Sequence, residues 1–133
     1  MQPTRSLTAH CTLSHHPAGQ PLLTVDNGYA KAQISLFGAH VLSYQRHDEP
    51  ASIWLSDKAV LDSSKPIRGG IPLCWPWFGP APARVGSGKP SHGFARTSLW
   101  TLDGVSDHGD GTLVHLSLRD NEATRQLWPH AFE

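Results

Sequence analysis

Arg68, His92 and Arg96 are the side chains of this sequence best suited to binding a small polar molecule. A guanidinium presents a planar fork of donors that matches a phosphate or a pair of sugar hydroxyls. Arg68 precedes Gly69-Gly70, where bare backbone lets a ligand approach closely. His92 precedes Gly93 and lies four residues before Arg96, and an imidazole can donate or accept a proton near neutral pH. These residues predict a site for a molecule that carries a phosphate or sugar hydroxyls.

Each of the three residues also has an ordinary structural interpretation. Most arginines are solvated, cap a carbonyl or pair with a carboxylate, and here Asp62 and Asp103 are the candidate partners. A lone histidine is more often a structural residue than an acid or a base. From the residues alone, both interpretations stay open for Arg68, His92 and Arg96.

The segment between the two arginines combines a stiff backbone with apolar bulk. Residues 66–90 hold six of the eleven prolines and five of the twelve glycines. A flexible linker of such composition is polar. This segment instead carries five large apolar side chains: Ile71, Leu73, Trp75, Trp77 and Phe78. We predict an ordered functional loop packed onto a core, with most of its three aromatic rings buried and one available to a ligand.

Other catalytic and cofactor sites are not indicated. Gly88-Lys89 lacks the spacing and the strand-to-helix context of a phosphate-binding P-loop. The nine histidines are scattered without metal-ligand spacing, and no serine lies in a nucleophile-elbow pattern. We therefore do not predict a metal ion at the site.

Strand patterns dominate the rest of the chain. Residues 22–25 and 30–36 carry apolar side chains, alternating with polar ones over 30–36, and flank Asn27-Gly28, a pair typical of a tight hairpin turn. Further strands are predicted at residues 41–44, 53–55, 99–105 and 112–118. Asp120 or Asn121 can cap a short helical turn. The predicted fold is all-β, an antiparallel sandwich.

Length and composition fit one domain with a small-molecule ligand. Residues 1–21 are polar and predicted to be a loose lead-in segment, and residues 22–133 are predicted to form the β domain. The net charge is zero, and no basic run marks a surface for nucleic acid or membrane. Cys11 and Cys74 do not make a disulfide framework. With no signal peptide or membrane span recognised, we expect a cytoplasmic protein.

Several strings along the chain carry a resemblance to a known family: FGAHVLSY, IWLSDKAVLD, KPIRGGIPLCWPWFGP, SHGFAR and LWPHAFE. From about Leu22 to its last residue, the chain resembles the D-hexose-6-phosphate mutarotases, or glucose-6-phosphate 1-epimerases, of the aldose-1-epimerase superfamily. The resemblance implies an antiparallel β-sandwich of the galactose-mutarotase-like type, incomplete at its C-terminus. It also implies the interconversion of α and β anomers of hexose 6-phosphates without metal or cofactor.

The resemblance assigns roles to four residues. Arg68 matches the arginine of the RGGIP motif, and Arg96 that of the HG-x-AR motif, which implies substrate contacts and, for Arg96, a phosphate ligand. Ser91 takes the place of a substrate-contacting glutamine of some relatives. His92 matches the histidine that orients the sugar, which implies a supporting role in catalysis.

The principal acid and base of the family have no match in the chain. In the family these are a histidine of a later His-Thr-Tyr motif and a glutamate nearer the C-terminus. We therefore expect the substrate-binding part of a mutarotase, with the alternatives of a non-catalytic sugar-phosphate-binding module or an inactive fragment. A peptide-binding domain is a weaker alternative. An incomplete sandwich has open strand edges, so we expect the chain either to be a fragment of a longer product or to self-associate.

Overall fold

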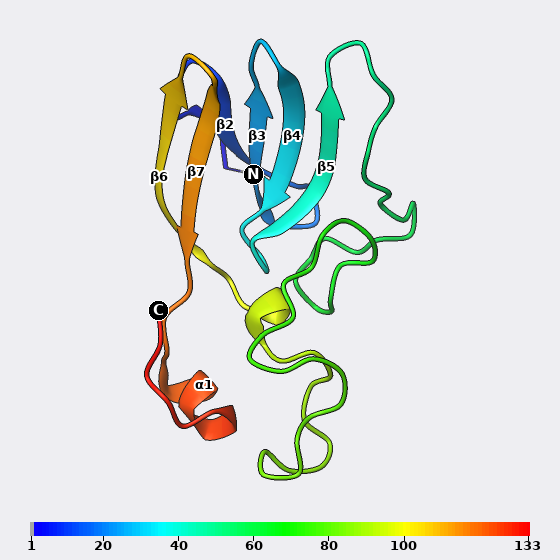
Figure 1. Ribbon diagram of the computed structural model, residues 1–133, viewed down its shortest axis with the longest axis vertical. Helices are drawn as coiled ribbons and strands as arrows, with labels where there is room; N and C mark the ends of the chain where they lie inside the picture. Colours follow the sequence, from blue (N-terminus) through cyan, green and yellow to red (C-terminus); the bar gives the residue numbers. More distant parts are fainter. Residues whose placement is uncertain (1) are drawn as a thin grey trace.

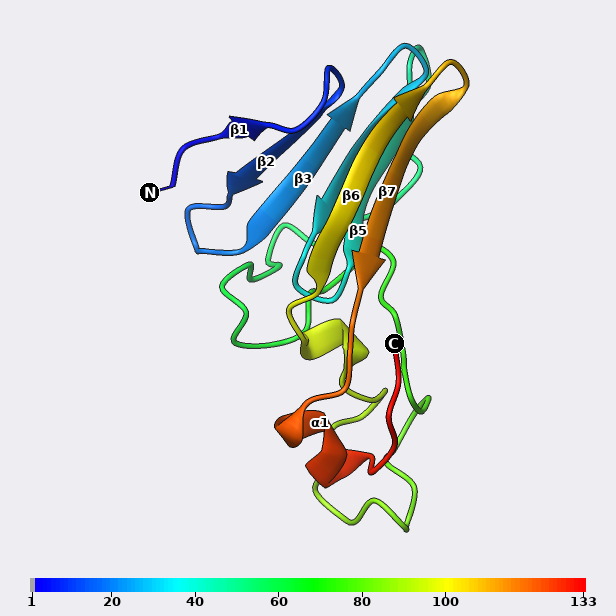
Figure 2. The ribbon, with the colours of Figure 1, turned by 90° about the vertical axis from the view of Figure 1, so that its left-hand side faces the viewer.

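Alternating apolar side chains build a five-stranded antiparallel sheet in the computed structural model, which describes residues 2–133. Its strands follow the order of the chain: β1 (Arg5–Ser6), β2 (Cys11–His15), β3 (Pro21–Asp26), β4 (Ala30–Ser35) and β5 (His40–Arg46). A separate hairpin of β6 (Thr101–His108) and β7 (Gly111–Ser117) packs against one face of this sheet (Figure 1, Figure 2). The prediction of an all-β, antiparallel fold is confirmed.

The sheet buries apolar side chains on both of its faces. Leu23 and Val25 face the β6–β7 hairpin. On the opposite face, Leu22 and Leu42 are covered by apolar residues of the segment 55–67. Leu22 and Leu23 serve different cores because successive side chains of a strand point to opposite faces. A fully buried leucine such as Leu23 or Leu42 stabilises the fold by about 1.5–3 kcal/mol.

The polar N-terminal segment is ordered, and the prediction of a loose lead-in is wrong. β2 pairs with β3 from Cys11↔Val25 to His15↔Pro21. Cys11 is buried in the core between the two layers. The ladder with β3 therefore orders a strand whose own sequence is mostly polar. The division of the chain at residue 21 stays a prediction.

The predicted strand at residues 53–55 is also wrong. Leu55 forms one isolated bridge with Gly69, and the Trp54 side chain is 67% exposed. The segment crosses the backbone at Gly69 rather than running along a strand. Its apolar residues indicated burial, but only part of that burial is realised.

The C-terminal part follows the prediction closely. The β6–β7 hairpin is followed by the helix α1 (Glu122–Leu127). The Asn121 side chain accepts a hydrogen bond from the Thr124 N–H, and the Thr124 hydroxyl accepts one from the Asn121 N–H, both at 2.9 Å. This reciprocal cap starts the helix. Among residues 2–133, no helix has the length and hydropathy needed to cross a membrane.

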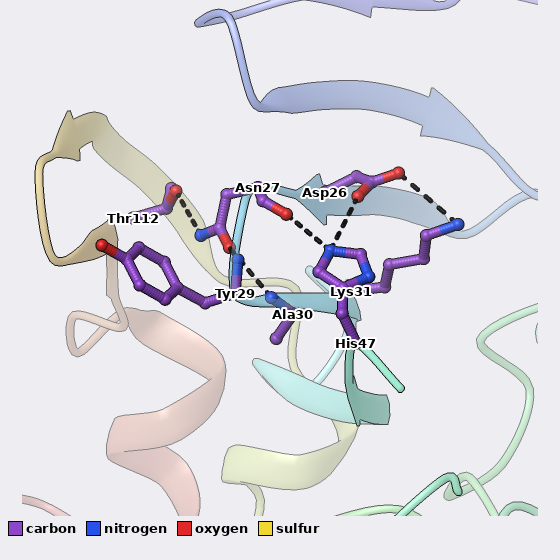
Figure 3. Close-up of polar contacts among 7 residues, drawn as sticks. All are labelled: Asp26, Asn27, Tyr29, Ala30, Lys31, His47 and Thr112. Atoms are coloured by element: carbon purple, nitrogen blue, oxygen red, sulfur yellow. Dashed lines mark hydrogen bonds and ion pairs between the residues drawn. The ribbon is translucent and has the colours of Figure 1, made fainter. Parts of the chain in front are cut away.

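A polar network joins the two layers at the end of the sheet where β3 turns into β4 (Figure 3). The Asn27 side chain accepts hydrogen bonds from the N–H groups of Tyr29 and Ala30, at 2.9 and 3.0 Å. Its amide donates to the Thr112 hydroxyl of β7 at 3.1 Å. The His47 ring nitrogen Nε2 lies 2.6 Å from the Asn27 carbonyl. Asn27 therefore makes the hairpin turn and also fixes the second layer to it.

The opposite end of the sheet holds the irregular part of the chain. The β4–β5 turn, the loop of residues 66–95, the 3-10 turn η1 (Ala95–Thr97) and α1 gather there (Figure 1). The predicted site residues lie in this region.

Candidate functional site

A close backbone crossing holds the segment that carries Ser91, His92 and Arg96. Gly93 forms an isolated parallel bridge with Trp75, and the two residues after Gly93 donate their N–H groups to the Trp75 carbonyl at 3.0 and 3.1 Å. A Cβ on Gly93 would overlap that carbonyl, and the φ of Gly93 is 72°. Only glycine permits this crossing.

The His92 ring has a defined direction. Its Nδ1 accepts a hydrogen bond from the Gly79 N–H at 3.0 Å, and its own backbone N–H donates to the Gly79 carbonyl at 2.8 Å. Because Nδ1 accepts, Nε2 is the ring nitrogen that can donate to a ligand. The φ of His92 is 64°, in the left-handed region that is uncommon and unfavourable for non-glycine residues.

Arg96 is half-buried and partly held by its neighbour. Its Nη2 donates to the Ser91 carbonyl at 3.1 Å. The Ser91 hydroxyl donates to the Gly79 carbonyl at 3.2 Å. The Arg96 Nε is buried and has no hydrogen-bond partner among residues 2–133. The guanidinium is thus anchored at one nitrogen, which limits its rotation and leaves other donors for a ligand.

Arg68 reaches this end of the sheet on a different segment. Its side chain is exposed, and its carbonyl accepts the Ser56 N–H at 3.1 Å. The next carbonyl, that of Gly69, lies 2.6 Å from Nε2 of His40. Burial and, to a smaller extent, the positive charge of Arg96 lower the pKa of His40, against the opposing effect of the Gly69 bond. The structure therefore brings Ser91, His92 and Arg96 together, and it places the backbone that follows Arg68 against His40, whose pKa is lowered in part by the charge of Arg96.

Carboxylates do not neutralise the two arginines. In residues 2–133 neither Arg68 nor Arg96 forms an ion pair, so the alternative pairing with Asp62 or Asp103 is not found. Within the same residues, no three metal-ligating side chains are placed to hold an ion. Two unneutralised guanidinium groups favour an anionic ligand.

The aromatic rings differ from the prediction that most of them are buried. Only Trp77 of the three is buried, and its indole N–H donates to the Pro90 carbonyl at 2.9 Å. Trp75 is 41% exposed and packs edge-on against Phe94. Phe78 is 80% exposed, with its ring 4.7 Å from that of His92. Phe78 is therefore the ring that is available to a ligand beside His92.

An apolar groove of about 540 Å³ lies next to this site but does not include it. Its lining includes Leu73, Trp75, Trp100, Leu116 and Phe132. The four predicted site residues are not part of its lining. Such a surface suits another polypeptide better than a sugar phosphate.

Two residues at the site escaped the sequence interpretation. His40 is 1% exposed and begins β5. His40 lies two residues before the buried Leu42, so both side chains point to the same face of the strand. A polar side chain at such a core position is the signal that could have identified His40. Trp100 donates its indole N–H to the Ala95 carbonyl at 2.9 Å and so supports the turn that carries Arg96. No sequence pattern indicated that contact.

The chain is similar to several known proteins. Residues 21–133 match the family described as aldose 1-epimerase. The chain is 42% identical over 111 residues to a protein of Salmonella typhimurium and, to the same extent, to one of Escherichia coli, both named "Putative glucose-6-phosphate 1-epimerase". Each match covers 84% of this chain. The crystal structure of a mutarotase, described as putative, from Salmonella typhimurium superposes with a TM-score of 0.89 at 38% identity over 97% of the chain.

The matched relatives are much longer than this chain. It spans 37% of the length of the two bacterial proteins and 43% of the chain in the crystal structure.

Proposed function

The chain belongs to the aldose 1-epimerase family, and from this premise we propose that it forms the substrate-binding part of a hexose-6-phosphate 1-epimerase. The reaction interconverts α and β anomers. A base removes the anomeric hydroxyl proton and an acid protonates the ring oxygen. The ring opens, the bond to the carbonyl carbon rotates, and closure returns both protons.

The observation that carries the proposal is that an oriented histidine, His92, and an anchored arginine, Arg96, lie together at one end of the sheet. The backbone that follows a second arginine, Arg68, contacts the same end through His40. Arg96 and Arg68 supply bidentate donors for a phosphate. His92 offers Nε2 to a sugar hydroxyl, which is a supporting role in the proton transfers. Ser91 acts through its carbonyl, which anchors Arg96, because its hydroxyl already donates to Gly79.

Binding of glucose 6-phosphate by calorimetry tests the proposal. We expect Arg96→Ala to weaken binding by about 10- to 100-fold, since a hydrogen bond to a charged group is worth about 1.5–3 kcal/mol. Arg46→Ala is the matched control, because Arg46 is an exposed arginine paired with Glu49 at the other end of the sheet. Equal affinities of the two variants would contradict the proposed site.

Catalysis by the 133-residue polypeptide is a separate question. The sequence contains no His-Thr-Tyr motif, so we expect binding without faster anomer exchange. Exchange of glucose 6-phosphate anomers can be followed by NMR against the rate in buffer alone. Clear acceleration would show that the chain supplies its own acid and base. Binding without acceleration supports the alternative of a non-catalytic sugar-phosphate-binding module.

Self-association with a second copy is part of the proposal. In the residues that the structure describes, the β6–β7 hairpin pairs with no further strand. Leu99 and Ile71 are 62% and 49% exposed, and the apolar groove is open beside them. Open edges and apolar surface both favour pairing between chains. Light scattering that gives the mass of a monomer at all concentrations would contradict it.

A further inference from the structure

We propose that His40 is a positioning residue that holds the two arginine-bearing segments, residues 68–71 and 91–96, in place for a sugar phosphate. The inference rests on the proposed function for its ligand. The geometry that supports it concerns the β4–β5 turn, residues 36–39, together with the first two residues of β5, His40 and Val41.

The start of β5 contacts the Arg68 segment. Nε2 of His40 lies 2.6 Å from the Gly69 carbonyl. The Ile71 N–H donates to the Val41 carbonyl at 2.9 Å. A Cβ on Gly70 would lie 2.7 Å from Nε2 of His40 and would overlap the Val41 carbonyl. The glycine pair therefore allows the backbone after Arg68 to rest directly on the imidazole.

The β4–β5 turn itself contacts the Arg96 segment. The Gly38 N–H donates to the Ser98 carbonyl at 2.7 Å, and the Trp100 N–H donates to the Leu36 carbonyl at 2.8 Å. A Cβ on Gly38 would lie only 2.6 Å from the Arg96 carbonyl oxygen. The backbone of Arg96 is thus in direct contact with the turn that His40 completes.

The buried ring has a defined donor and a defined acceptor. His40 is 1% exposed, and a neutral ring that donates from Nε2 to the Gly69 carbonyl keeps an acceptor at Nδ1. Among residues 2–133, both this Nδ1 and the Arg96 Nε are buried without a partner. The lowered pKa keeps the ring neutral at pH 7 and so preserves this arrangement. A leucine would fill the space but would leave the Gly69 carbonyl unpaired.

Three substitutions of His40 separate positioning from simple core filling. His40→Gln keeps an amide donor at the reach of Nε2, His40→Asn places its amide too short to reach Gly69, and His40→Leu has no donor. Gln20→Leu is the control, because Gln20 is fully buried and bonded to Ser35 at 2.8 Å without touching either arginine segment.

Affinity for glucose 6-phosphate is the first measurement. We expect His40→Leu and His40→Asn to bind about tenfold more weakly than the control, because each leaves the buried Gly69 carbonyl unpaired. His40→Gln restores binding to within about threefold of the unsubstituted chain. Equal binding by His40→Asn and His40→Gln overturns the inference. If His40→Leu does not fold, the comparison of His40→Asn with His40→Gln still tests the inference.

Hydrogen exchange is the second measurement and needs no ligand. Exchange of the Ile71 and Gly38 amides should accelerate about tenfold in His40→Asn, relative to amides of β3, but not in His40→Gln or Gln20→Leu. Unchanged exchange in His40→Asn overturns the inference. If the unsubstituted chain binds no glucose 6-phosphate while these amides respond, the proposed function fails and the positioning role of His40 stands.

Discussion

The two ends of the five-stranded sheet are closed in different ways. At the Asn27 end, both the oxygen and the nitrogen of the Asn27 side chain have hydrogen-bond partners, and these bonds connect the turn to β4 and β7. At the His40 end, a buried imidazole and a half-buried guanidinium each retain an unpartnered nitrogen among residues 2–133. Polar groups left unpaired in a folded protein cost free energy and mark candidate functional sites. The difference agrees with the proposal that the His40 end binds a ligand, whereas the Asn27 end contributes to stability.

Alanine at two glycines tests this comparison most strongly. Gly93→Ala should destabilise the fold by about 3 kcal/mol or more, because the new Cβ overlaps the Trp75 carbonyl at a φ of 72°. Gly28→Ala, in the Asn27 turn, meets no atom within 4 Å and should be nearly neutral. Urea unfolding gives both values. Similar losses would mean that the two ends are equally constrained.

Removal of the Asn27 side chain should have the next largest effect. Asn27→Ala deletes three hydrogen bonds, two to the turn and one to Thr112, and should destabilise the protein by about 1–3 kcal/mol. Affinity for glucose 6-phosphate should not change. Tyr29→Phe, which deletes only the hydroxyl bonded to the Gly109 carbonyl, is a milder control. A weaker affinity of Asn27→Ala for glucose 6-phosphate would show that the Asn27 end also contributes to binding.

The sequence indicated the Asn27 end well and the His40 end poorly. The Asn-Gly pair and the alternation of residues 30–36 are local signals, and both elements form as predicted. The burial of His40 depends on Gly69, which lies 29 residues away along the chain. The order of β2 likewise comes from its ladder with β3. Local sequence patterns predict turns and strands. Contacts between distant segments determine which polar groups become buried, and a local pattern does not predict them.

The pH dependence of the free energy of unfolding should show a contribution from His40, at one end of the sheet. The folded pKa of His40 is lowered by burial and by the charge of Arg96, so the unfolded chain binds more protons below the ordinary value of 6.5. Stability is therefore full above pH 6.5 and is lost as the pH falls below it. His40→Gln should remove this contribution, which urea unfolding at several pH values would detect. An unchanged slope in His40→Gln would show that other groups produce it.

The smallest expected effect is that of Phe78. Phe78→Ala should weaken glucose 6-phosphate binding by about three- to fivefold, since one aromatic contact is worth about 0.5–1.5 kcal/mol. Its stability should stay close to that of the unsubstituted chain because the ring is 80% exposed. Leu113→Ala, at an exposed apolar side chain of β7, is the control. Unchanged affinity would limit the binding site to polar contacts.

The bond between Asn27 and Thr112 spans 85 residues of sequence, and this has a consequence during synthesis. The five-stranded sheet is complete at Arg46, whereas the hairpin that covers Leu23 and Val25 ends at Ser117. A ribosome adding about 5–20 residues per second leaves that apolar face uncovered for roughly 4–14 s. The nascent chain is therefore most exposed to aggregation and to chaperone binding before β6 and β7 emerge.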